Sequence, residues 1–326
     1  MRPETAALLP LICLGCRRRE GDFWDLHSLA WEGATLACAR CGRRDPIVDG
    51  IPVLYADLAD YVARDGWGLA ERDMDLDAAA LLALAGPDES PFARTAENLS
   101  TYLDAHWGDR AEPRPDGPAE SAGLGPLVGK LRALAGERVA RAIELGAGVG
   151  RGTVELAAGA EVCVGMDRSL SSLRRARRLA AGERVPYLRR VAGRHYAPAT
   201  AVGVAAPVDW LCADALDPPL APESFDRVAA LNLLDAVHDP GRLMDVAVTL
   251  CSPGGEVIFA SPYAWQSSHV GEAHRIGGAD PAAAVRARLV AAGFTVEDED
   301  ELSWTLRRDA RSAVVYRTHW LRARKA

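Results

Sequence analysis

The chain has 326 residues, of which 49% are apolar and 25% are charged, a composition typical of a folded soluble protein and not of a disordered one. Its formal net charge of −7 provides no global attraction to nucleic acid, although local basic patches could still supply one. The longest apolar runs, at 202–207 and 229–234, are far shorter than the roughly 20 residues that cross a bilayer. We therefore expect no membrane span, and the absence of a leader-like N-terminus predicts a cytoplasmic protein.

Two pairs of cysteines lie near the N-terminus. Cys13 and Cys16 form one C-x-x-C turn, Cys38 and Cys41 form another, and 21 residues separate the pairs. Two such turns can supply four thiolates to one tetrahedral ion, which favours a zinc site over four unrelated buried thiols. Because all four positions are cysteines, no coordination position remains for an activated water, and we expect the zinc to be structural.

The segment after the second pair, residues 45–54, reads as a turn of Asp, Gly and Pro between two short β-branched runs. With the cysteines it resembles the zinc ribbon of activator subunits of tRNA and protein methyltransferases, over residues 10–55. Six arginines flank the cysteines and could contact RNA phosphates or balance the negative charge of a zinc tetrathiolate. They are Arg17, Arg18, Arg19, Arg40, Arg43 and Arg44.

The next segment, 56–106, has a helical pattern, and 108–126 is rich in Pro, Gly and charge and predicts a loop. We expect a zinc ribbon at 1–55, a helical connector and loop at 56–126, and a larger domain at 127–326. Tyr102 and His106 share one helical face at a spacing of four. They could form a core stripe, or the helix could close over a ligand pocket.

From residue 138 apolar runs alternate with amphipathic stretches, which predicts a parallel sheet flanked by helices. A first strand at 140–145 is followed by a glycine-rich loop at 146–152, at the edge of the sheet where open α/β folds bind small molecules. A dinucleotide fingerprint needs a third glycine at position 151, which is Arg151, so NAD is disfavoured.

The loop has the pattern E-x-G-x-G-x-G, and the next strand, 162–167, ends in an aspartate 17 residues after the last of these glycines. A strand-end Asp can accept both ribose hydroxyls of an adenosine. The pattern resembles class I S-adenosylmethionine methyltransferases, and strands at 210–215, 224–232 and 253–259 match that family in order. The resemblance implies a Rossmann-like α/β sheet and these cofactor-binding residues: Glu144, Gly146, Gly148, Gly150, Asp167, Arg168, Asp214, Ala215 and Asn232.

Two further parts of this domain are readable. The helix after Asp167 carries several arginines, which could be a solvated face or a phosphate-binding surface. The stretch 302–320 alternates as a hairpin and suits the last two strands of the family fold. An inactive domain that binds the cofactor without using it is the alternative to an enzyme.

The strings at 232–240 and 261–265 follow the fourth and fifth strands and should lie beside the cofactor. With the string at 102–108 they resemble the methyltransferase domain of ovothiol synthases, although a zinc ribbon is not part of those synthases. The resemblance implies N-methylation of an imidazole in a histidine-derived small molecule, of the 5-thiohistidine type or its selenium analogue. It implies Tyr263 and His106 as catalytic residues, and Tyr102, Asn232, Tyr263 and Trp265 as substrate-binding residues.

Simpler interpretations remain for several of these residues. Trp265 could be a core residue and Tyr263 could only cap a strand, while His238, His269, His274 and His319 are expected at the surface. The main alternative function is an RNA methyltransferase resembling the ribosomal guanine-N1 enzymes, which predicts a continuous basic surface and salt-sensitive RNA binding. In a third interpretation the ribbon docks a protein partner. The sequence makes no prediction of the oligomeric state.

Overall fold

The structure is a computed structural model that describes residues 8–20, 23–65, 91–113, 124–193, 195–265, 267 and 270–326. Its strands are β1 (Arg18–Glu20), β2 (Phe23–Asp25), β3 (Ala30–Glu32), β4 (Thr35–Ala37), β5 (Arg44–Val48), β6 (Ile51–Leu54), β7 (Ala111–Glu112), β8 (Val139–Leu145), β9 (Ala160–Asp167), β10 (Arg184–Ala192), β11 (His195–Val202), β12 (Val208–Ala213), β13 (Phe225–Leu231), β14 (Cys251–Ser261), β15 (Phe294–Arg307) and β16 (Ala313–Lys325). Its α-helices are α2 (Leu58–Asp65), α4 (Pro91–Trp107), α5 (Gly125–Ala133), α6 (Arg151–Ala157), α7 (Leu170–Ala180), α8 (Pro240–Leu250) and α9 (Pro281–Ala291).

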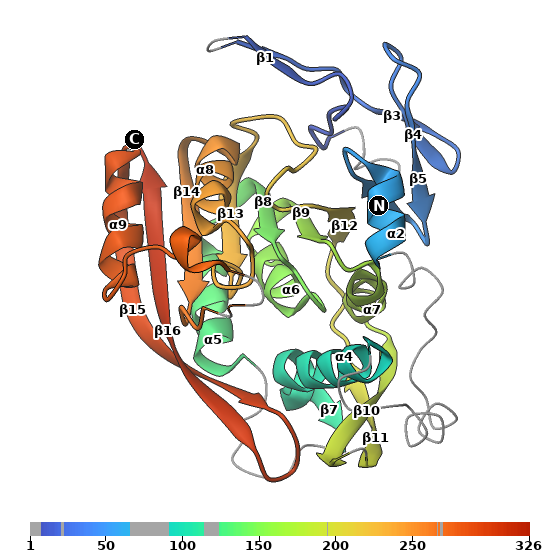
Figure 1. The fold of residues 1–326 in the computed structure, drawn as a ribbon, viewed down its shortest axis with the longest axis vertical. Helices are drawn as coiled ribbons and strands as arrows, with labels where there is room; N and C mark the ends of the chain where they lie inside the picture. Colours follow the sequence, from blue (N-terminus) through green and yellow to red (C-terminus); the bar gives the residue numbers. More distant parts are fainter. Residues whose placement is uncertain are drawn as a thin grey trace.

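One large mixed sheet organises the described residues (Figure 1). Its strand order is β15-β16-β14-β13-β8-β9-β12-β6-β5-β4-β3. The strands β14, β13, β8, β9 and β12 are parallel, and β16 runs antiparallel to β14. The first strand of the central unit, β8, therefore lies in its middle, and the chain reverses direction across the sheet between β8 and β13. This confirms the predicted Rossmann-like α/β fold, including the hairpin that ends it.

Side chains that alternate along the strands pack both faces of the sheet. On β8, Ile143 and Leu145 join a core with Leu243 of α8 and Val285 of α9, whereas Ala142 points to the core under α5 and α6. A third core lies between α7, α4 and the end of the sheet that carries β12. Because both faces are covered, the free edge of the parallel strands at their carboxyl ends is the part left to bind a ligand.

The N-terminal segment is joined to this sheet by backbone pairing. β6 lies parallel to β12, with Val53 opposite Cys212, and β5, β4 and β3 continue the sheet beyond it. Local sequence patterns did not indicate this pairing because its two strands are more than 150 residues apart. The proposed borders at residues 55 and 126 stay predictions, and the expected connector helix around 76–84 falls outside the described residues.

A second small sheet, β10-β11-β7, and the long hairpin β15–β16 stand on either side of α4. The tip of the hairpin reaches β10, where the Ala310 N–H donates to the carbonyl of Val191 at 3.1 Å. The base of the hairpin is fixed by Arg322, whose Nε donates to the buried Glu256 at 2.7 Å. No helix among the described residues is long and apolar enough to cross a membrane.

Candidate active site

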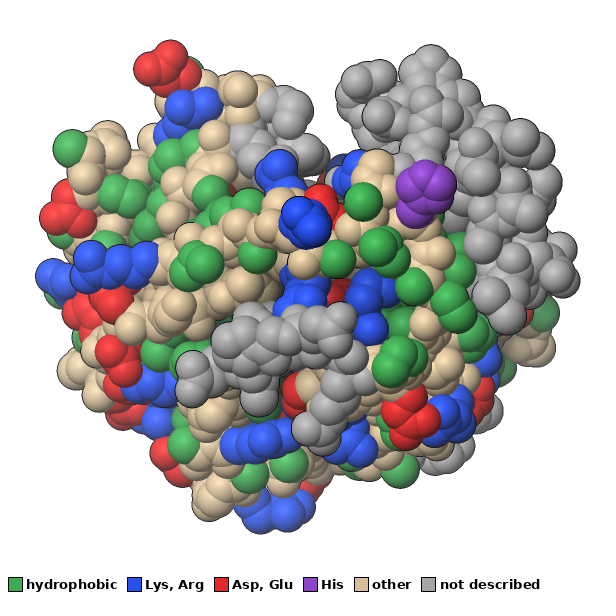
Figure 2. Space-filling view, turned by 90° about the horizontal axis from the view of Figure 1, so that it is seen from below, with side chains coloured by type: hydrophobic (Ala, Val, Ile, Leu, Met, Phe, Trp, Pro, Cys, Tyr) green, Lys and Arg blue, Asp and Glu red, His purple; other side chains and the backbone are tan. Residues whose placement is uncertain are grey.

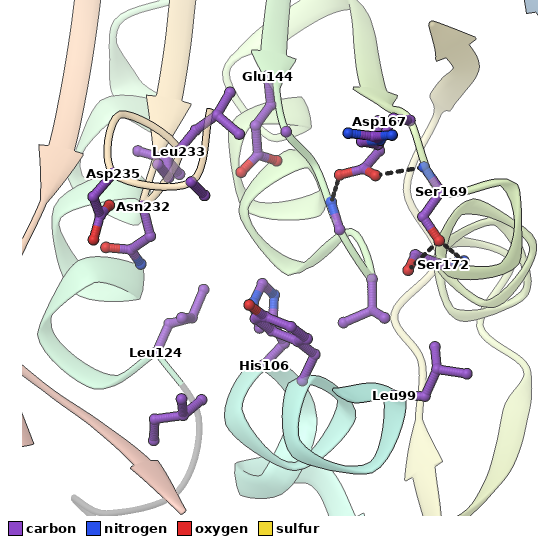
Figure 3. Close-up of a pocket in the computed structure, with 18 of the residues that line it drawn as sticks. Leu99, His106, Leu124, Glu144, Asp167, Ser169, Ser172, Asn232, Leu233 and Asp235 are labelled. Atoms are coloured by element: carbon purple, nitrogen blue, oxygen red, sulfur yellow. Dashed lines mark hydrogen bonds between the residues drawn. The ribbon is translucent and has the colours of Figure 1, made fainter. Parts of the chain in front are cut away.

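A cavity of about 430 Å³ opens at the carboxyl ends of β8, β9 and β13. Figure 3 shows Asp167, Ser169 and Ser172 on one side of it and Asn232 and Asp235 on the other. Its floor is the loop after β8, and α4 and the β15–β16 hairpin contribute the opposite wall. A volume of this size suits a small molecule, and the location is the one at which parallel α/β sheets bind ligands.

The carboxylate of Asp167 fixes the geometry of this edge. Its Oδ2 accepts a hydrogen bond from the Gly148 N–H at 2.8 Å, and its Oδ1 accepts one from the Ser169 N–H at 2.8 Å. One side chain thus joins the loop after β8 to the turn after β9. Burial raises the pKa of Asp167, although the hydrogen bonds from the backbone oppose the shift. Each oxygen retains a further lone pair for a ligand hydroxyl.

The loop after β8 approaches the cavity with bare backbone. Gly146, Gly148 and Gly150 all have positive φ angles, of 77°, 53° and 85°. A Cβ at Gly150 would lie 2.6 Å from the ring of Trp210, so this position is closed by packing. A Cβ at Gly148 would meet only the Cε1 of His106, at 3.9 Å, and would project into space along the cavity wall. The loop therefore forms a cradle that a side chain would fill.

Glu144 lies beneath this loop, at the end of β8, and is only 2% exposed. Its Oε2 accepts a hydrogen bond from the hydroxyl of Thr153 on α6. Burial raises the pKa of Glu144 to about 8, so the carboxyl is largely protonated at neutral pH in the absence of a ligand. A positively charged ligand nearby would favour its ionised form.

Helix α4 is clamped over the loop by Arg151, which is 1% exposed. Its Nη1 donates to the carbonyl of His106 at 2.9 Å, and its guanidinium forms an ion pair with Asp109 at 2.7 Å. The indole N–H of Trp107 also donates to the carbonyl of Val149 at 2.9 Å. These contacts hold His106 at the cavity. Burial, assisted by the nearby Arg151, lowers the pKa of His106 to about 4, so its ring is neutral at physiological pH.

The four N-terminal cysteines converge at a second site. The sulfurs of Cys13, Cys16, Cys38 and Cys41 all lie within 4.8 Å of one another, and two of the pairs are 3.7 Å apart. A tetrahedral ion bound at about 2.3 Å separates its sulfur ligands by about 3.8 Å. The donor set and its spacing therefore fit a four-coordinate metal ion.

Residues 143–259 match the protein family described as "Methyltransferase domain". The chain carries an S-adenosylmethionine-dependent methyltransferase domain. It is therefore an enzyme. Similar solved structures include the N-methyltransferase NodS from Bradyrhizobium japonicum in complex with S-adenosyl-l-homocysteine, at 16% identity over 71% of this chain and 97% of that one, with a TM-score of 0.45. Another is an S-adenosylmethionine dependent methyltransferase from Mesorhizobium loti, at 20% identity over 61% of this chain and 100% of that one, with a TM-score of 0.39.

The residues of the methyltransferase cavity fit this cofactor. Asp167 can accept from ribose hydroxyls, Gly148 leaves room for close approach, and Asn232 presents a buried side-chain Oδ1 that has no hydrogen-bond partner among the described residues. Three carboxyl groups line the cavity, from Glu144, Asp167 and Asp235, which suits a molecule with a net positive charge. When bound, the cofactor supplies an electrophilic methyl group on a sulfonium.

The structure gathers only part of the predicted site at the cavity. Its wall includes these predicted residues: Tyr102, His106, Glu144, Gly146, Gly148, Asp167, Arg168 and Asn232. Gly150, Asp214, Ala215, Tyr263 and Trp265 are not among the lining residues that the structure describes. Asp214 instead accepts from the Leu216 N–H at 2.9 Å. The roles assigned to all of these residues stay predictions.

Tyr263 and His319 form a buried pair behind the cavity wall. The Tyr263 hydroxyl lies 2.8 Å from His319 Nδ1, and His319 Nε2 lies 2.9 Å from Glu299. His319 is only 4% exposed, so the expectation that it lies at the surface was wrong. Its burial follows from its position on β16 beside β14, where it faces the core. His269 lies outside the described residues.

Several cavity residues were not predicted from the sequence. Tyr61 of α2 reaches the wall, and its hydroxyl contacts the carbonyl of Arg168 at 3.4 Å. Asp235 follows β13, and Trp304 and Tyr316 come from the hairpin. A signal for Asp235 was present in the string after the fourth strand, but hairpin residues carry no motif.

Replacing Gly148 by Ala tests the cradle. Alanine at a φ of 53° strains the backbone by about 1–2 kcal/mol, and its methyl group would also enter the cavity. We expect the affinity for S-adenosylhomocysteine, measured by calorimetry, to fall at least about tenfold. Gly278→Ala is the matched control, because Gly278 has a φ of 52° and no neighbour within 4 Å of an added Cβ. Equal effects of the two variants on affinity would contradict the cradle.

The pKa of Glu144 predicts a pH dependence of cofactor binding. A cationic ligand lowers the pKa of this carboxyl below its free value of about 8, so binding releases a proton and strengthens as pH rises towards that value. The affinity for S-adenosylmethionine should increase by up to about tenfold between pH 7 and pH 9. Calorimetry in buffers of different ionisation enthalpy would detect the released proton. Glu144→Gln should flatten the profile, and an unchanged profile in that variant would refute the assignment.

Proposed function

We propose that this enzyme N-methylates the imidazole of a histidine-derived small molecule, of the 5-thiohistidine or selenium-analogue type. The observation that carries the proposal is the enclosed cavity, in which α4 and the hairpin stand over the cofactor-binding loop. A polymer substrate would have to insert a single base into this space, whereas a small ring fits as a whole.

The acidity of the acceptor also suits the site. An imidazole has an ordinary pKa near 6.5, so much of it is neutral at physiological pH and carries a free lone pair. The His106 ring, with a pKa of about 4, is a weak base, and the neutral acceptor does not require a stronger one. The ring of His106 can instead orient the acceptor, since its buried Nδ1 has no partner among the described residues. Tyr102 packs edge-on against it, with ring centroids 6.0 Å apart.

The charge distribution gives less support to an RNA substrate. Many arginines of the ribbon are already engaged with carboxylates: Arg17 with Asp217, Arg40 with Asp25, Arg43 with Asp45 and Arg44 with Glu32. In the helix after Asp167, Arg174 pairs with Asp49 and Arg178 with Glu183. Figure 2 shows blue and red side chains side by side over much of one face. Paired arginines attract phosphate less than free ones do.

We also propose that the four-cysteine cluster holds structural zinc and that residues 10–55 are a zinc ribbon. The ribbon contacts the domain through Arg17, whose Nη1 donates to the carbonyl of Pro218 at 3.1 Å. It also pairs with the main sheet through β6. The metal would thus stabilise an extension of the methyltransferase sheet.

Metal analysis of the purified protein should find about one zinc ion per chain. Cys38→Ser should lose the ion and melt at a lower temperature, because the cluster would lack its fourth ligand. Cys251→Ser should keep it, since Cys251 is a buried thiol outside the cluster. Protein that folds equally well with and without a chelator, and contains no zinc, would disprove a structural metal.

The acceptor is tested by incubating the protein with S-adenosylmethionine and histidine, 5-thiohistidine, its selenium analogue or total RNA. Mass spectrometry should detect a methyl group on at least one imidazole compound and none on RNA. Gly148→Ala serves as the control for cofactor-dependent transfer. Methylated RNA with unmodified imidazoles would favour the alternative, an RNA methyltransferase.

A further inference from the structure

The half of the cavity away from Asp167 has a chemical character of its own. Asn232 and Asp235 lie there, after β13, across the cavity from Asp167 and Ser169 (Figure 3). The β15–β16 hairpin adds Trp304 and leaves its indole against the cavity. None of the roles considered so far uses Asp235 or Trp304.

Trp304 has a buried donor without an acceptor. The side chain is 6% exposed, and its Nε1 has no hydrogen-bond partner among the described residues. Other buried tryptophans are satisfied: Trp107 donates to a carbonyl at 2.9 Å and Trp320 donates to Asp298 at 2.8 Å. Leaving a buried donor unpaired costs about 1–3 kcal/mol, so its position at a ligand cavity points to a ligand acceptor atom.

Trp304 also provides a flat apolar surface. Its ring stacks on that of Tyr316 on the neighbouring strand, with centroids 5.4 Å apart and planes inclined by 26°. The two residues are directly opposite each other in the hairpin register, and both line the cavity. A fixed pair of aromatic rings favours a planar ligand.

Asp235 supplies a buried carboxylate on the facing side. It is 7% exposed, and its oxygens accept from the Ser261 hydroxyl at 3.2 Å and from the Ala264 N–H at 3.0 Å. Within the described residues, no Lys or Arg forms an ion pair with it. These two bonds fix its direction and leave lone pairs for a ligand N–H. The nearby Asn232 Oδ1 is a further unpaired acceptor.

We propose that Asp235 and Trp304 form the acceptor subsite and select a planar nitrogen heterocycle that carries both an N–H donor and an acceptor group. Asp235 accepts from the ring N–H, which leaves the other ring nitrogen with its lone pair, and the Trp304 N–H donates to an acceptor group of the ligand. A ring that becomes positively charged on methylation gains a carboxylate neighbour. The inference rests on the proposed function for the identity of the ring, and it makes Trp304 a specificity-determining residue.

The test measures binding to protein saturated with S-adenosylhomocysteine. The probes are histidine, 5-thiohistidine and nicotinamide, with phenylalanine as a ring that lacks nitrogen. Trp304→Phe keeps an aromatic ring and removes the N–H, and it should weaken the bound heterocycle about tenfold. Asp235→Asn should weaken it by at least about tenfold, since a charged acceptor is lost. Ser303→Ala, an exposed neighbour on β15, is the matched control and should bind like the wild type.

The affinity for S-adenosylhomocysteine should stay unchanged in all three variants, which verifies that they fold. If histidine compounds bind and neither variant weakens them, the subsite is refuted while the proposed function stands. If only nicotinamide binds and both variants weaken it, the subsite stands and the histidine-derived acceptor fails. Phenylalanine binding as tightly as the heterocycles, or no heterocycle binding the wild-type complex, would overturn the subsite.

Discussion

Two hydrogen bonds from the backbone to one carboxylate hold together the edge of the sheet on which this active site depends. Asp167 accepts from Gly148 in the loop after β8 and from Ser169 in the turn after β9, each at 2.8 Å. The parallel pairing of β8 with β9 brings these loops to the same edge, and the carboxylate then sets their spacing. The position of every other group in the cavity is defined relative to this edge.

The cover of the cavity is attached to the same edge. Arg151 begins α6 directly after the glycine loop and binds both Asp109 and the carbonyl of His106. On its other side, α4 is held through Asp104, which accepts from the Tyr187 hydroxyl at 2.7 Å and from Arg189 at 2.7 Å. The ends of α4 are thus tied to the main sheet and to the small sheet. This arrangement excludes solvent from a site in which methyl transfer needs an aligned nucleophile.

The sequence was sufficient to predict the order of the strands and the loop that ends β8, because glycines and strand-end acids are local features with a chemical reason. It was also sufficient for the cysteine cluster, since paired C-x-x-C turns have few other uses. The pairing of β6 with β12 and the stacking of Trp304 on Tyr316 at the cavity were beyond local patterns. Alternation in a hairpin shows which residues share a face, but not what that face will cover. Arg151 illustrates the same limit, because its meaning as a clamp depends on Asp109, 42 residues away.

The central claim is that this cavity holds the cofactor, with Asp167 at its ribose and the glycine loop beneath it. The most direct measurement is a crystal structure of the protein with S-adenosylhomocysteine. The account predicts ribose hydroxyls within hydrogen-bond distance of the Asp167 carboxylate and a sulfur atom that faces Asn232 and Asp235. A nucleoside bound at another edge of the sheet, or a cavity that stays free of ligand at saturating concentration, would contradict it.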